Sequence, residues 1–177
     1  MLFPDVFLRW EEMASDKARW VGWLVLVHSA RTAVAAVASL LVARLFRLPE
    51  AYWAPITTLV ITQSSLGAAL AVSWQRFVGT ALGAVAGAVA ASYFGPHVLV
   101  FAASVFILGL LCALARADLI AYRYGGVTLA IVFLIPREGS AWRIAFNRFA
   151  EVSIGIAMAL ILTVLWPERE VTPAEKK

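Results

Sequence analysis

The chain has 177 residues, of which 62% are apolar and only 15% are charged, and its mean hydropathy is +0.84. Soluble domains are about 45–50% apolar and about one quarter charged, so this composition excludes an ordinary soluble domain and indicates a membrane protein. The net charge is +4. The arginines fall mostly at the ends of apolar runs, as membrane proteins place them, so we expect no nucleic-acid partner.

The sequence also lacks the motifs of disulfide-bonded, metal-binding and catalytic proteins. The single cysteine, Cys112, excludes an intramolecular disulfide. The sequence has no zinc-ligand spacing, no phosphate-binding loop and no recognisable pair of nucleophile and base. We therefore expect no metal, no cofactor and no enzymatic activity.

Residues 1–28 form the first predicted segment. The apolar residues Val6, Phe7, Trp10 and Met13 recur at helical spacing among acidic residues. The segment lacks the compact apolar core of a signal peptide. It is predicted to be an amphipathic helix that lies on the membrane surface.

Six apolar runs follow, and a helix needs about 20 such residues to cross the hydrocarbon core. The predicted spans are 29–46, 51–71, 75–94, 97–115, 119–135 and 142–166. Tryptophan and tyrosine lie near most of their ends, as expected at the two membrane interfaces. We predict an all-α, multi-pass inner-membrane protein with a six-helix domain over 29–167 and a disordered cytoplasmic tail over 168–177. Basic residues favour a cytoplasmic location for both termini.

The second and third predicted spans share residues with the fifth and sixth. The matched segments are Ala51-Tyr52 with Ala121-Tyr122, Thr58-Leu59 with Thr128-Leu129, and Arg76-Phe77 plus Gly83 with Arg148-Phe149 plus Gly155. Chance similarity between alanine-rich segments is the alternative. The shared Arg-Phe followed by glycine favours an inverted repeat of three helices, a common construction in secondary transporters.

Ionisable residues inside apolar runs are candidates for function, because an arginine or aspartate at a helix centre costs about 2.5–3.5 kcal/mol on insertion scales. The candidates for binding an anion are Arg31, Arg76, Arg123 and Arg148. For the first three, extension of the side chain to the headgroups is an equally good explanation. Glu151 follows Arg148 at helical spacing i, i+3. The two form either an ion pair that makes both tolerable in lipid, or a site where Glu151 carries a proton during transport.

Two further patterns bear on packing. Gly79, Gly83 and Gly87 repeat every fourth residue and leave a flat stripe on one helix face. The stripe predicts close helix contact, within the chain or between subunits, or a pore lining. The polar stretch 63–65, followed by Leu66-Gly67, interrupts the second predicted span and is explained by a bend at a cavity or by interhelical hydrogen bonds.

Short motifs resemble a known family. They are His28 to Ala33, Ala51 to Pro55, Arg76 to Thr80 followed by Gly83, Arg148 with Gly155, and Leu165 to Pro167. Together they resemble the membrane domain of the fusaric-acid-resistance-like family, which includes aromatic acid exporters, and more distantly plant aluminium-activated malate transporters. The resemblance implies efflux of aromatic carboxylic acids or other organic anions, with the arginines as positive partners. Many members carry two six-helix blocks, so it also implies a homodimer or larger homo-oligomer.

The sequence thus predicts a transporter or channel for small organic anions in the lipid bilayer. The alternative is a membrane scaffold or accessory subunit that transports nothing. Flux through liposomes separates the two.

Overall fold

The computed structural model describes residues 4–62, 65–95, 97–135 and 139–166, and all regular structure within these ranges is α-helical. The helices are α1 (Pro4–Leu45), α2 (Trp53–Ile61), α3 (Leu66–Tyr93), α4 (Val98–Leu114), α5 (Leu119–Leu134) and α6 (Ala141–Leu165). The prediction of an all-α chain is confirmed. By length and composition, residues Val25–Leu45 of α1 and all of α6 are able to cross a membrane, and α4 and α5 are shorter apolar helices.

The chain divides into two compact units, residues 1–34 and 35–177. Helix α1 runs without a break through the predicted junction at residues 28 and 29 and supplies nearly all of the first unit. Its first residues lie among those whose side chains are not described, so the amphipathic surface helix stays a prediction. The predicted tail 168–177 lies outside the described residues.

One predicted span is wrong. In place of a single helix over 51–71, α2 ends at Ile61 and α3 begins at Leu66. Thr62 leaves helical geometry with a ψ of 113°, and Ser65 caps the next helix by accepting a hydrogen bond from the Ala68 amide at 3.3 Å. A serine cap satisfies an amide that the first turn leaves free, so Ser65, the last residue of the polar stretch, starts a new helix. Helix α3 therefore begins earlier than the predicted residue 75.

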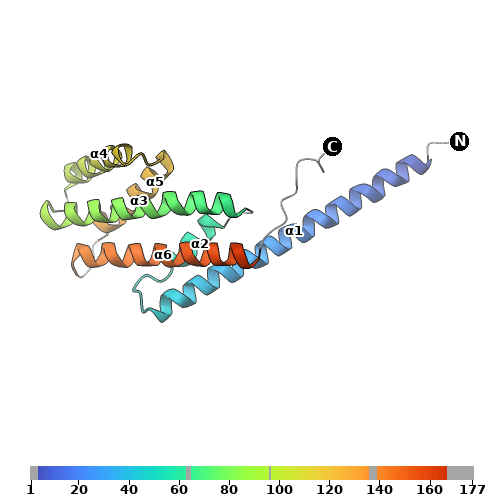
Figure 1. Ribbon diagram of the computed structural model, residues 1–177, viewed down its shortest axis with the longest axis horizontal. Helices are drawn as coiled ribbons and strands as arrows, with labels where there is room; N and C mark the ends of the chain where they lie inside the picture. Colours follow the sequence, from blue (N-terminus) through green and yellow to red (C-terminus); the bar gives the residue numbers. More distant parts are fainter. Residues whose placement is uncertain (1–3, 63–64, 96, 136–138, 167–177) are drawn as a thin grey trace. The chain divides into compact units, whose positions relative to one another are not determined.

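Helix α3 is at the centre of the second unit. It packs most extensively against α5 and also against α6, which lies beside it, while α2 packs on α6 and α4 covers α3 and α5 (Figure 1). Leu108, Cys112 and Leu129 are buried where α4 meets this group. Large apolar side chains cover the outward surface of α4, among them Val98, Leu99 and Leu114. In a bilayer such a surface faces lipid, which solvates it as well as a protein core would.

The glycine stripe lies inside this packing. A Cβ atom at Gly79 would strike the Ala121 carbonyl of α5, and one at Gly83 would strike the Gly125 carbonyl. At Gly87 it would meet the Leu129 backbone at 3.2 Å. These three positions therefore contact α5 within the chain and do not offer the stripe to a second subunit.

Candidate functional site

Arg148 lies at the centre of a buried charged cluster. Its Nη2 donates to Glu50 Oε2 at 2.7 Å, and its Nη1 lies 3.5 Å from Glu151 Oε2. The Arg148 and Glu151 side chains are 2% and 1% exposed, against 16% for Glu50. The predicted i, i+3 ion pair is therefore present. A second carboxylate, from the segment between α1 and α2, joins it.

Two further contacts fix this cluster. The backbone amide of Glu50 donates to Glu151 Oε1 at 3.1 Å, which attaches the segment before α2 to α6. The Arg148 guanidinium carbon lies 4.1 Å from the centre of the Trp53 ring, within the range of a cation–π interaction. A shared network of this kind offsets much of the cost of burying three charges.

Arg76 of α3 has a different environment. It is buried, its Nη2 donates to Thr57 Oγ1 at 3.0 Å, and its guanidinium carbon lies 4.7 Å from the centre of the Tyr124 ring. Its buried Nε has no hydrogen-bond partner. Among the described residues, no carboxylate forms a salt bridge with Arg76. A buried guanidinium without an anionic partner is costly, and an anionic ligand would relieve that cost.

Both arginines line one cavity of about 190 Å³. Its wall is formed by Trp53, Ile56, Arg76, Thr80, Tyr124, Val127, Thr128, Ile131, Arg148 and Val152. Apart from the two guanidiniums this wall contains no charged group, and it includes two aromatic rings. We call it the inner cavity.

Arg148 also lines a second, more polar cavity of about 420 Å³, which we call the polar cavity. The remaining lining residues are Arg47, Pro49, Glu50, Arg143, Ile144, Asn147 and Glu151. Arg148 and its two carboxylates therefore lie where the polar cavity approaches the inner one.

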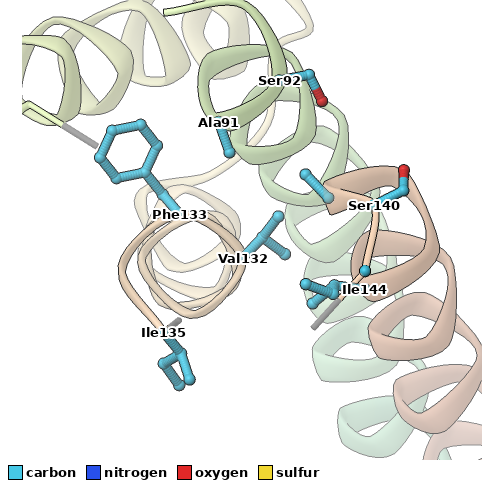
Figure 2. A pocket seen from close by; sticks show the side chains of 9 residues that line it. Ala91, Ser92, Val132, Phe133, Ile135, Ser140 and Ile144 are labelled. Carbon is cyan, nitrogen blue, oxygen red and sulfur yellow. The ribbon is translucent and has the colours of Figure 1, made fainter. Parts of the chain in front are cut away.

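A third cavity, of about 440 Å³, lies where α3, α5 and α6 meet, with Val132 pointing toward Ile144 (Figure 2). Ser92 and Ser140 are on its rim, and no ionisable side chain is among its lining residues. Because none of its described lining residues carries a charge, the inner cavity is the better candidate site for an anion.

The structure brings together two of the four predicted anion-binding arginines, Arg76 and Arg148. Arg123 is exposed on α5 and does not line the inner cavity. Arg31 lies on α1 in the first unit. Their part in binding stays a prediction, as does the proton-carrying role of Glu151.

Sequence reasoning missed Glu50, Trp53, Thr57 and Tyr124 as site residues. In the sequence, Glu50 follows the Arg-Leu-Pro stretch directly after the first predicted span. One signal was available: it is an acid placed directly before an apolar run that contains Trp53 and ends in the polar stretch 63–65. An acid at such a position needs a partner when the following helix packs inside a membrane protein.

The cluster predicts unequal effects on stability. Arg148→Met leaves the Glu50 and Glu151 carboxylates without their shared partner, and breaking a buried pair costs about 3–5 kcal/mol. Glu151→Gln should cost less, because Arg148 keeps Glu50 at 2.7 Å and the glutamine oxygen can still accept from the Glu50 amide. Thermal unfolding in detergent measures both, with the exposed Arg143→Met on the same helix as control. An equal or larger loss in Glu151→Gln contradicts this account.

The chain is similar to several known proteins. The sequence profile described as fusaric acid resistance protein-like matches residues 20–162. The chain is 32% identical over 154 residues to the protein named inner membrane protein YeeA of Escherichia coli K12, with 81% of this chain and 42% of the relative aligned. It is 27% identical over 156 residues to proteins named putative arylamide transporter in Mycobacterium bovis and Mycobacterium tuberculosis, with 85% of this chain and 42% of each relative aligned.

The chain thus spans less than half the length of these curated relatives. No solved structure matches it significantly. The profile match covers most of the chain, including every residue that lines the inner cavity. Together with its apolar helices, this match shows that the chain is a membrane protein of the fusaric acid resistance protein-like family.

Proposed function

We propose that this chain forms part of an inner-membrane transport system for small organic anions, with aromatic carboxylates as the main substrate class. One observation carries the proposal. The buried Arg76 guanidinium has no carboxylate partner among the described residues and faces a cavity with aromatic walls. A carboxylate that enters would gain a charge-assisted hydrogen bond from Arg76.

The dimensions of the inner cavity suit a molecule with one ring. An apolar protein cavity of about 150 Å³ accepts benzene. The inner cavity measures about 190 Å³, which leaves room for a ring and one carboxylate. The apolar side chains Val127, Ile131 and Val152 would contact the ring while Arg76 binds the charge.

The relatives support the same class of function. The mycobacterial relatives are named as putative arylamide transporters, and an arylamide has an aromatic ring in common with the substrates proposed here. The Escherichia coli relative is named as an inner membrane protein, which supports the proposed location.

We also propose that the six-helix domain is an inverted repeat of three helices. Helices α3 and α6, which carry the matched Arg-Phe motifs, each place an arginine over an aromatic ring of the other half. Arg76 of α3 lies over Tyr124 of α5, and Arg148 of α6 lies over Trp53 of α2. The glycines correspond as well: Gly83 contacts α5, and a Cβ atom added at Gly155 would lie 2.5 Å from the Ala54 carbonyl oxygen of α2.

Three further expectations from the sequence remain proposals. Both termini face the cytoplasm, Arg31 and Arg123 guide the anion outside the inner cavity, and the working unit is a homodimer or larger. Because Gly79 and Gly83 already pack against α5 within the chain, a contact between subunits would have to use another surface.

Flux and competition test the function. Purified chain in liposomes should accumulate radiolabelled benzoate faster than empty liposomes. Unlabelled benzoate should compete at least tenfold more strongly than benzamide, because benzamide has the ring without the charge that Arg76 pairs with. Equal competition would favour a neutral aromatic substrate. Flux no higher than in empty liposomes would favour the scaffold or accessory subunit.

A further inference from the structure

We propose that Glu50 is an internal competitor of the substrate: its carboxylate occupies Arg148 and is displaced when an anion passes from the polar cavity to the inner cavity. This inference rests on the proposed function. It assigns a role in substrate selection to a side chain that does not line the inner cavity.

The location of Arg148 carries the first step. Arg148 lines both cavities, so an anion that moves between them passes this residue. On the side of the inner cavity it is stacked over the Trp53 ring, and on the side of the polar cavity it is bonded to Glu50 at 2.7 Å. Glu50 Oε2 therefore stands where a substrate carboxylate would bind Arg148 on arrival.

The two carboxylates of the cluster differ in their freedom to move. Glu151 is 1% exposed and extends from the interior of α6, whereas Glu50 is 16% exposed and lies between α1 and α2. Glu151 also accepts from the Glu50 backbone amide at 3.1 Å, which fixes the backbone of this segment. Rotation of the Glu50 side chain toward the polar cavity would expose Arg148 Nη2 to an incoming anion, while Glu151 stays 3.5 Å from Nη1.

The charges around the polar cavity favour such an exchange. Arg47 and Arg143 line it together with Arg148, so an entering anion meets positive charge before it reaches Glu50. The displaced Glu50 carboxylate would meet the same two arginines. A neutral aromatic molecule has no negative charge to replace that of the Glu50 carboxylate on Arg148, so the exchange admits anions selectively.

The test is equilibrium binding of radiolabelled benzoate to the purified full chain in nanodiscs. Glu50→Gln removes the competing charge while retaining side-chain length, and we expect the benzoate Kd to fall at least tenfold. Glu50→Asp keeps the charge on a shorter side chain that no longer reaches Arg148 at the same distance, and its Kd should lie between the two. Asp118→Asn is the matched control: Asp118 also lies just before a helix but accepts from Gln75 at 2.7 Å, so its Kd should stay within twofold of wild type.

The outcomes separate this inference from the proposed function. Weaker or unchanged binding in both Glu50 variants overturns the competitor role, and if Arg76→Ala weakens binding at least tenfold, the proposed function stands. Binding by Glu50→Gln alone, with none by wild type, supports the competitor role in its strongest form. Absence of benzoate binding in every variant overturns both. If Glu50→Gln does not fold, Glu50→Asp decides the question.

Discussion

Arg76→Ala should reduce benzoate binding and benzoate flux by about 10- to 100-fold, because a hydrogen bond to a charged group contributes about 1.5–3 kcal/mol. Arg76 is the guanidinium of the inner cavity that forms no salt bridge with a carboxylate of the described residues, so its charge is available to a ligand. Arg76→Lys should restore binding only in part, since lysine lacks the planar fork that binds a carboxylate through two nitrogens.

The same measurements distinguish binding from folding. Arg116→Gln removes an exposed arginine between α4 and α5 and should leave the benzoate Kd unchanged. Arg76→Ala should elute as a single species, because it removes a costly buried charge and takes contacts only from Thr57 and the Tyr124 ring among the described residues. Wild-type affinity in a well-folded Arg76→Ala protein would remove the inner cavity from consideration as the anion site.

Gly83→Ala should be the most damaging single-methyl change in the chain. The added Cβ would strike the carbonyl oxygen, the carbonyl carbon and the Cα of Gly125, all of which are backbone atoms. Backbone cannot rotate away as a side chain can, so α3 and α5 must separate along their length. Overpacking of this kind costs about 1–3 kcal/mol in most cores, and we expect a loss at or above the top of that range.

Gly126→Ala provides the matched control for this prediction. Gly126 is the neighbour of Gly125 on α5, and a Cβ there meets nothing within 4 Å. It should therefore keep wild-type stability, or gain slightly from the better helix propensity of alanine. Thermal unfolding in detergent and the folded yield after extraction measure both variants. Similar stability of Gly83→Ala and Gly126→Ala would show that α3 and α5 are less closely packed.

Composition and local spacing were enough to predict part of this molecule. The apolar runs predicted an all-α chain, and helical spacing predicted the Arg148–Glu151 pair. The glycine spacing predicted close helix contact but left its partner open, and the structure identifies α5. Each of these features is determined by residue spacing within a single helix, so it can be read from the sequence alone.

The features that the sequence did not predict depend on contacts between distant segments. Glu50 and Arg148 are far apart in the chain, as are Arg76 and Tyr124, and hydropathy carries no information about which helices meet. The break between α2 and α3 was missed for a different reason. An apolar run of sufficient length predicts one spanning helix, and only the caps at Thr62 and Ser65 show that it is two. The polar stretch was a visible signal, but it also fits hydrogen bonding between intact helices.

The backbone contacts of the glycines have a mechanical consequence. Where the backbones of two helices touch directly, no side chain lies between them that could change rotamer to absorb a small displacement. Helices α3 and α5 should therefore translate and rotate together as one rigid body, and α6 with α2, joined at Gly155, as another. The two bodies meet along α3 and α6, where the Phe77 and Phe149 rings contact one another, and Arg76 and Arg148 come from opposite sides of this surface. Relative motion of the two bodies would change the width of the inner cavity without breaking the contacts that define each body.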